Sequence, residues 1–138
     1  MFMRKIFILI ILSATIALAG CGSPTNKAAV TGVITHTHPM TLPVGYVVTI
    51  QIDDTTKADA PSKKIAEQVI KSQGEELPMP FAIDYDPGKI NANHTYSMRV
   101  NIEDSAGKIL YTNNTSVPVI TNGNPTQNVD VIVVLVNG

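Results

Sequence analysis

The residue of this chain best suited to covalent chemistry is Cys21, its only cysteine. A basic pair, Arg4 and Lys5, precedes an uncharged apolar stretch over residues 6–19, and small residues lead into the thiol. This order is typical of a secretory signal peptide. The apolar stretch is shorter than the roughly 20 residues that a spanning helix needs. We therefore predict that residues 1–20 are a signal peptide and not a membrane span.

The run Leu18-Ala19-Gly20-Cys21 resembles the lipobox of bacterial lipoproteins. The resemblance implies cleavage before Cys21, a thioether-linked diacylglycerol on its thiol and an acyl chain on its new amine. Stable anchoring needs two or more acyl chains, and this lipid supplies three. Gly22 and Ser23 stand where an aspartate would retain a Gram-negative lipoprotein in the inner membrane. The expected location is therefore the outer membrane, on its periplasmic face, with no cofactor besides the covalent lipid.

Three histidines are weak candidates for a metal site. His36 and His38 are two residues apart, so on a strand both rings would lie on one face. Such a pair binds zinc or copper when a third ligand, such as His94 or a carboxylate, comes near. The alternative is a pair of exposed polar side chains leading into Pro39, and we expect that no metal is bound.

Acidic pairs are the remaining candidates for chemistry, at Asp53-Asp54, Glu75-Glu76 and Asp84 with Asp86. Paired carboxylates can act as acid and base or bind calcium. No calcium-loop, nucleophile-elbow or phosphate-loop pattern accompanies them, and adjacent acids in turns are usually solvated. We expect no enzymatic activity.

Composition limits the kind of partner. Of ten basic side chains, Arg4 and Lys5 leave with the signal peptide, so eight remain against eleven acidic ones. The resulting charge of about −3 argues against nucleic acid as a partner.

Residues 21–28 are mostly small and polar, as in a short tether after the lipid. Residues 29–138 are then a single domain with one hydrophobic core.

The elements of this domain are predicted to be β-strands. Apolar and polar residues alternate over 46–53, 81–85 and 96–103, which is typical of half-buried strands. Turn sequences with Pro or Gly separate them. We therefore predict an all-β fold, a single compact β-sandwich of about seven mostly antiparallel strands. Its predicted core contains Ile50, Ile52, Phe81, Ile83, Met98, Val100 and Ile102.

The sequence pattern of two segments fits more than one structure. Residues 60–74 show apolar spacing and end signals that fit either a helix or a short strand. Residues 129–136 are apolar on both faces except at Asp130. If this run is one strand, Ile132, Val134 and Val136 lie on the face opposite Val129, Val131, Val133 and Leu135. That second apolar face needs a cover, either the N-terminal segment of the protein or an interaction partner.

Residues 30–136 resemble the YbaY/YscW family of lipoproteins and type III secretion lipoprotein chaperones. The resemblance is carried by Asp54 to Pro61 with Ile65-Ala66-Glu67-Gln68, Pro78 to Phe81, Tyr85-Asp86-Pro87, Ile90, Tyr96, Arg99, Ile109 to Thr112 and Val117-Pro118-Val119. It implies a compact β-sandwich, in which residues 64–71 are a strand.

Two residues of this family block have predicted structural roles. Asp59 is expected to accept hydrogen bonds from backbone amides of its loop. Glu67 is expected to form an ion pair with Arg99 across the sheet.

The same resemblance implies a protein-interaction or chaperone role in the cell envelope. In the secretion branch of the family the expected partner is a secretin, and the protein would act as a pilotin. The alternative is a periplasmic binder of a small apolar ligand or envelope component, with a pocket between the sheets.

Overall fold

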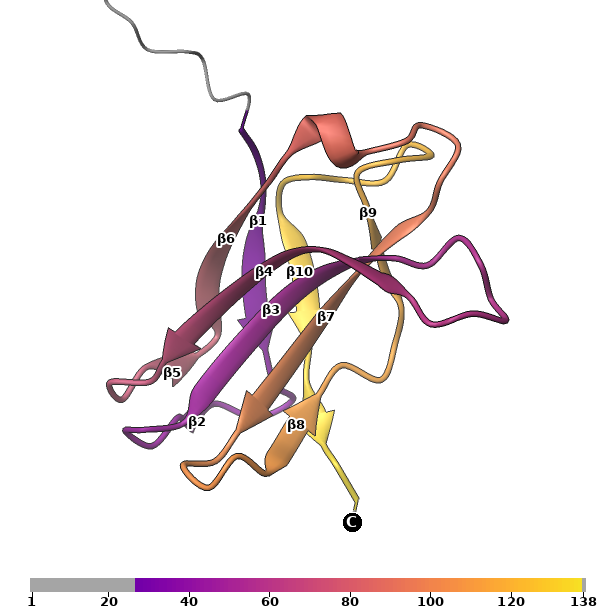
Figure 1. Cartoon of the computed structure of the whole chain (residues 1–138). Helices are drawn as coiled ribbons and strands as arrows, with labels where there is room; N and C mark the ends of the chain where they lie inside the picture. Colours follow the sequence, from indigo (N-terminus) through magenta and orange to yellow (C-terminus); the bar gives the residue numbers. More distant parts are fainter. Residues whose placement is uncertain (1–26, 138) are drawn as a thin grey trace, which may run out of the picture.

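Two β-sheets face each other in the computed structural model, which describes residues 27–137 (Figure 1). The smaller sheet has the strand order β10 (Val129–Ile132), β1 (Ala28–Thr35), β6 (Met79–Tyr85). The larger sheet has the order β11 (Val134–Leu135), β8 (Ile109–Thr112), β7 (Tyr96–Glu103), β3 (Val47–Asp54), β4 (Lys63–Lys71). A short strand, β9 (Val117–Val119), also pairs with β7. The pairings are antiparallel except that of β1 with β10.

The other described elements are short. Strands β2 (Met40–Thr41) and β5 (Glu76–Leu77) pair at one end of the sandwich. A single turn of 3-10 helix, η1 (Pro87–Lys89), lies at the other end (Figure 1). No helix within residues 27–137 has the length and apolar character needed to cross a membrane. The prediction of an all-β sandwich is confirmed, and the described strands exceed seven because several are only two or three residues long.

The core lies between the two sheets and consists mainly of aliphatic side chains. Each predicted core residue is buried, at 0–6% exposure: Ile50, Ile52, Phe81, Ile83, Met98, Val100 and Ile102. Alternation is strictest in β7, where the first, third, fifth and seventh residues are buried. A period of two places those side chains on one face, so burial of that face fixes the register of the strand.

The ambiguous segment 60–74 forms a strand, β4, as the family resemblance implied. It pairs antiparallel with β3 along its whole length and ends the larger sheet. The register shifts between Ile52 and Asp53, where Ile65 is the extra residue of a bulge in β4. The apolar spacing that fits a helix therefore combines an alternating strand with one bulged residue.

The predicted single strand over residues 129–136 is wrong. The chain leaves the smaller sheet at Val133 and enters the larger one, so β10 and β11 belong to different sheets. The N–H of Val133 still donates to Thr35 O at 2.9 Å, whereas Val136 donates to Leu110 O at 2.8 Å. Leu135, predicted on the buried face, is 56% exposed because the smaller sheet ends at Ile132, before it.

Candidate functional site

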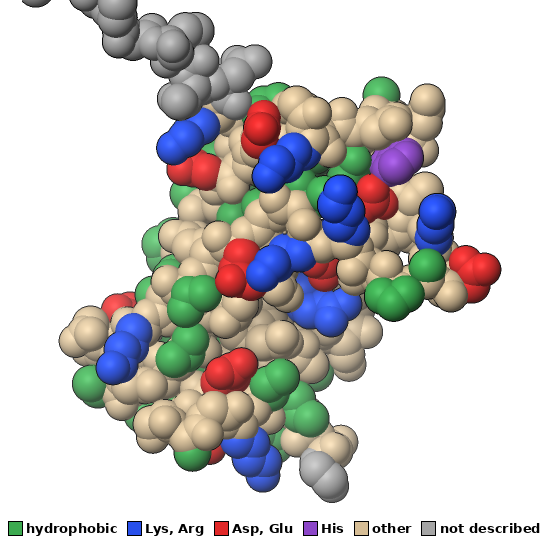
Figure 2. All heavy atoms as spheres, viewed as in Figure 1, with side chains coloured by type: hydrophobic (Ala, Val, Ile, Leu, Met, Phe, Trp, Pro, Cys, Tyr) green, Lys and Arg blue, Asp and Glu red, His purple; other side chains and the backbone are tan. Residues whose placement is uncertain are grey.

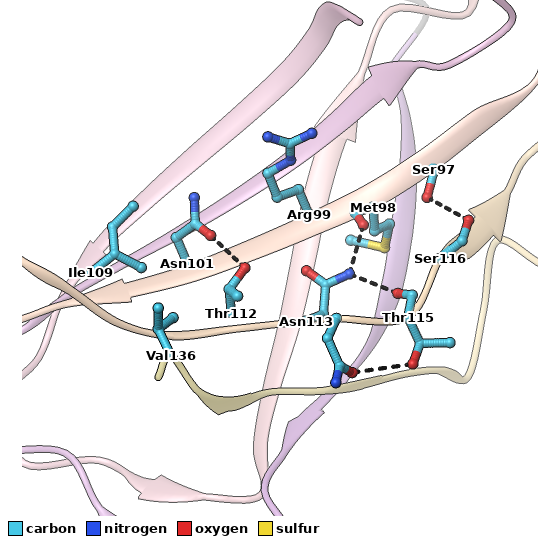
Figure 3. A pocket seen from close by; sticks show the side chains of 11 residues that line it. Ser97, Met98, Arg99, Asn101, Ile109, Thr112, Asn113, Thr115, Ser116 and Val136 are labelled. Carbon is cyan, nitrogen blue, oxygen red and sulfur yellow. Dashed lines mark hydrogen bonds between the residues drawn. The ribbon is translucent and has the colours of Figure 1, made fainter. Parts of the chain in front are cut away.

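A groove of about 550 Å³ lies on the outer face of β7 and β8 (Figure 3). Side chains of β7 form its floor: Ser97, Arg99 and Asn101. Its far wall is the connection 113–116, between β8 and β9. Two partly exposed aliphatic residues from β8 and the C-terminal end of the chain close one end of the groove: Ile109 and Val136.

The groove exists because two strands share one edge of β7. Strand β8 pairs with residues 101–103 of β7, and β9 pairs with residues 96–98. Between them the chain bows away from the sheet, and the side chain of Asn113 takes the place of a strand. Its Oδ1 accepts from the N–H of Val100 at 2.8 Å, and its Nδ2 donates to Met98 O at 3.1 Å and Thr115 O at 3.0 Å. The backbone N–H of Val100 and the carbonyl of Met98, at this edge of β7, thereby have hydrogen-bond partners.

The polar groups of the groove form hydrogen bonds with one another. Thr112 Oγ1 donates to Asn101 Oδ1 at 2.7 Å, and the hydroxyls of Ser97 and Ser116 are 3.3 Å apart. Arg99 is the charged residue of the lining. Such a surface, with hydroxyls, amides, one cation and an aliphatic end, suits a polypeptide segment that contributes its own hydrogen bonds.

Arg99 also compensates a buried charge. Its Nε lies 3.4 Å from Asp53 Oδ2, while the side chains of Arg99 and Asp53 are 54% and 8% exposed. A buried carboxylate without a partner would be costly, so this contact holds the guanidinium over β3. More than half of the Arg99 side chain remains exposed.

The predicted ion pair between Glu67 and Arg99 is absent from the described residues. Both lie opposite Gln51, on strands that flank β3 from either side, so a whole strand separates them. Glu67 instead accepts from Lys64 and Gln51 at 2.8 and 2.9 Å, and these hydrogen bonds lower the pKa of its carboxyl. Figure 2 shows acidic and basic side chains interspersed on this face of the larger sheet.

Several exposed aliphatic residues lie on strands near the C-terminal end of the described chain. Of the predicted interaction residues, Ile132 and Val136 are 53% and 40% exposed, and Val134 is half-buried. Leu135 and Ile109 add 56% and 41% exposed side chains that the sequence did not single out for this role. Of these residues, Ile109 and Val136 line the groove. Ile132 is on the exposed face of β10 in the smaller sheet. Leu135 is in register with Tyr111 and Ile102, on the face of the larger sheet opposite the groove.

The candidate metal ligands are not brought together. His36 and His38 follow β1 at one end of the sandwich, with ring centroids 6.1 Å apart. His94 precedes β7 at the opposite end (Figure 1). Within residues 27–137 no group of three His, Cys, Asp or Glu side chains has the geometry of a metal site. His36 packs edge-on against Tyr111.

His94 belongs to a hydrogen-bonded cluster at the end of β3. Its Nδ1 lies 2.6 Å from Asp54 Oδ2, and Thr56 donates its hydroxyl and its N–H to Asp54 Oδ1. Burial of Asp54 opposes ionisation, but the hydrogen bonds from Thr56 and His94 outweigh it and lower the pKa of this carboxyl to about 2. The cluster joins the loop after β3 to the loop before β7.

The predicted role of Asp59 is wrong. Its side chain is exposed and accepts no hydrogen bond from the described residues, whereas Asp54 accepts from the loop amide of Thr56. Glu75 has a similar role in its own loop, where it accepts from Ser72 Oγ at 2.9 Å and Gln73 N at 2.7 Å. Backbone N–H groups of that loop and the Ser72 hydroxyl lower the pKa of Glu75. These carboxylates thus stabilise loops.

Two predictions lie outside the described residues, namely the signal peptide 1–20 and the lipidated Cys21. The predicted tether 21–28 overlaps the structure only at its last residues, because Ala28 already begins β1. Sequence reasoning missed the groove itself. Its available signal is the polar run Thr112-Asn113-Asn114-Thr115-Ser116, which is longer than a tight turn between two strands requires.

Comparisons with known proteins agree with this architecture. A family model described as type III secretion system lipoprotein chaperone (YscW) matches residues 25–131. The uncharacterized lipoprotein YbaY of Escherichia coli (strain K12) is 29% identical over 96 residues, which are 68% of this chain and 49% of that protein. The chain thus spans about half the length of this curated relative. The structure of an alternative pilotin from the type II secretion system of Vibrio cholerae matches with a TM-score of 0.72 and 32% sequence identity, over 81% of this chain and 99% of that chain.

Proposed function

Because the chain belongs to the family of type III secretion system lipoprotein chaperones, we propose that it is a pilotin-like lipoprotein that binds a secretin subunit in the cell envelope. Cleavage before Cys21 and acylation of that residue would anchor it to the outer membrane, with the domain on the periplasmic face. The bound secretin would be held at the membrane in which it assembles. The proposed role is non-enzymatic and needs no cofactor other than the lipid on Cys21.

The observation that carries this proposal is the match to a pilotin over 99% of that protein's chain, at a TM-score of 0.72. At 32% identity the likeness includes sequence as well as fold. Fold alone does not fix function. The proposal therefore also uses the family match over residues 25–131 and the signal-peptide and lipobox pattern that precedes it.

We assign partner binding to the groove over β7 and β8 and to the aliphatic residues at its end. Ser97, Asn101 and Ser116 offer hydrogen bonds to a bound segment, and Ile109 with Val136 offers apolar contact. An interface of this kind combines a small apolar centre with a polar rim. The alternative, a binder of a small apolar ligand between the sheets, stays a prediction, and the described core between the sheets is occupied by buried side chains.

The test is capture of the secretin by groove variants. Ser116 is exposed in the groove wall, so Ser116→Arg fills the groove without disturbing the core. The matched control is Ala82→Arg, at an exposed position of β6 on the opposite sheet. We expect Ser116→Arg to lose the secretin from a detergent extract of membranes while Ala82→Arg retains it. Equal capture by both variants would contradict the assignment of the groove.

A further inference from the structure

The N-terminal strand enters the fold at one end of the sandwich. Ala28, the first residue of β1, pairs with Tyr85 at the end of β6. The turn η1 and the connection between β9 and β10 lie at the same end (Figure 1). Seven residue steps separate Ala28 from Cys21, a reach of at most about 25 Å. An acylated Cys21 would therefore hold this end of the domain close to a bilayer.

This end carries a depression of about 440 Å³ with a partly apolar lining. It is lined by Tyr85, Pro87, Ile90, Ala92 and Ile120, together with the polar residues Thr121 and Asn122. Ile90 and Ile120 are only partly buried although they pack on the core. The depression is thus an extension of the core that opens at the tethered end.

The conformation of Ile120 is unusual. Its φ is +74°, in the left-handed region that β-branched residues rarely adopt. Three contacts of the same loop hold the backbone there: Thr121 N to Val119 O at 2.8 Å, Thr121 Oγ1 to His94 O at 2.6 Å, and Asn124 N to Thr121 O at 3.1 Å. Strain of this kind marks sites that need an otherwise unfavourable geometry. Here the geometry places an isoleucine beside Ile90 in the lining of the depression.

We infer that the end of the sandwich bearing Ile90 and Ile120 rests on the surface of the phospholipid bilayer. The inference rests on the proposed anchor at Cys21. A tether of this length gives the contact a high effective concentration, so a small apolar surface is sufficient. Tyr85 has the amphipathic character of residues found at the membrane interface.

Charge has a minor part in this contact. Lys27 and Lys89 are exposed at this end, but Asp84 and Asp86 are exposed beside them. The opposite charges balance, and Asp86 accepts from Gly88 N at 2.8 Å. Since apolar contact dominates, we expect the membrane contact to persist at high salt, where electrostatic attraction is screened.

Two exposed alanines at opposite ends of β7 allow a direct test. Ala92 lies in the depression, and Ala106 lies in the turn after β7, at the far end of the sandwich. Acylation consumes the thiol of the only cysteine, so Ala92→Cys or Ala106→Cys introduces the one free thiol for an environment-sensitive fluorophore. The full lipidated protein is reconstituted into vesicles of phosphatidylethanolamine and phosphatidylglycerol. A fraction of the lipid molecules in these vesicles carries a quencher on the acyl chain.

We expect a blue-shifted, lipid-quenched fluorophore at position 92 and an unquenched one at position 106, at low and high salt. Equal signals at both positions in protein that pellets with the vesicles would overturn the orientation and leave the anchor intact. A blue shift at 92 without quenching would mean that an acyl chain of Cys21 itself occupies the depression, which also overturns the bilayer contact. Protein that stays in the supernatant would overturn the anchor and this inference with it.

Discussion

Asn113 accepts a hydrogen bond from the backbone N–H of Val100 through its side-chain Oδ1, at 2.8 Å, and donates its own N–H to the carbonyl of Val100 at 3.3 Å. One residue thus supplies both partners that a neighbouring strand would give to Val100. This pairing lets the chain leave the edge of β7 without exposing unpaired backbone groups. The space opened in this way is the groove to which we assign partner binding.

Removing the Asn113 side chain should therefore destabilise the domain. Asn113→Ala leaves the N–H of Val100 without its partner and removes one donor to the carbonyl of Met98, at an expected cost of about 1–3 kcal/mol in the free energy of unfolding. The control is Asn114→Ala, because Asn114 is exposed and only accepts from Thr115. Urea unfolding followed by circular dichroism measures both variants. Equal stabilities would mean that the amide bridge contributes nothing.

Gly32 marks the tightest approach in the smaller sheet. A Cβ at this position would lie 1.8 Å from the carbonyl oxygen of Val129, on the parallel neighbour β10. Because the obstacle is backbone, Gly32→Ala should cost more than about 3 kcal/mol or prevent folding. Gly107→Ala has open space around it and only a positive φ of 85°, so its cost should be about 1 kcal/mol. Thermal unfolding of both variants shows which substitution destabilises the domain more. A smaller effect of Gly32→Ala than of Gly107→Ala would contradict the pairing of β1 with β10.

The Asp54 cluster predicts acid sensitivity. The pKa of Asp54 is about 2 in the folded protein against 3.8 for the free group, so the carboxylate contributes stability that is fully present above about pH 4. That contribution, up to about 2 kcal/mol, should disappear as the pH falls toward 2. The comparison is the pH dependence of the free energy of unfolding in wild type and in Asp54→Asn. If the two curves stay parallel between pH 4 and pH 2, Asp54 is not the responsible group.

The aliphatic end of the groove should matter for binding and not for folding. Val136 lines the groove and is 40% exposed, so Val136→Lys should change the unfolding free energy by no more than about 0.5 kcal/mol. Loss of one buried interface contact should weaken secretin binding at least about tenfold. The control is Val69→Lys, at a valine of β4 that is 59% exposed. Secretin binding is measured with the purified domain attached to a sensor surface. If both variants bound secretin like wild type, the assignment of partner binding to the groove would be contradicted.

The sandwich and its core could be predicted from the sequence because one buried face imposes alternation on each long strand. In β3 and β7 the inward residues follow one another at a period of two, and one-sided burial fixes their register. No such signal exists at Val133, where the run is apolar on both faces. The change of sheet at that residue therefore has no counterpart in the sequence pattern.

Contacts between strands that are distant in sequence were less predictable. Glu67 and Arg99 have complementary charges, yet the strand order places β3 between them, and strand order is not encoded in alternation. The role of Asn113 depends in the same way on where β8 stops along β7. A polar run such as 112–116 indicates a loop, but not that its side chains complete the edge of a strand.

The most direct test of the pilotin-like function is the location of the secretin in the cells that produce this protein. The amount of secretin multimer in the outer-membrane fraction is measured in wild type, in a strain lacking this chain and in Cys21→Ala. We expect abundant outer-membrane secretin in wild type and its loss in the other two, with Cys21→Ala protein still binding secretin in solution. An unchanged distribution of secretin in the strain lacking this chain would contradict the pilotin-like function.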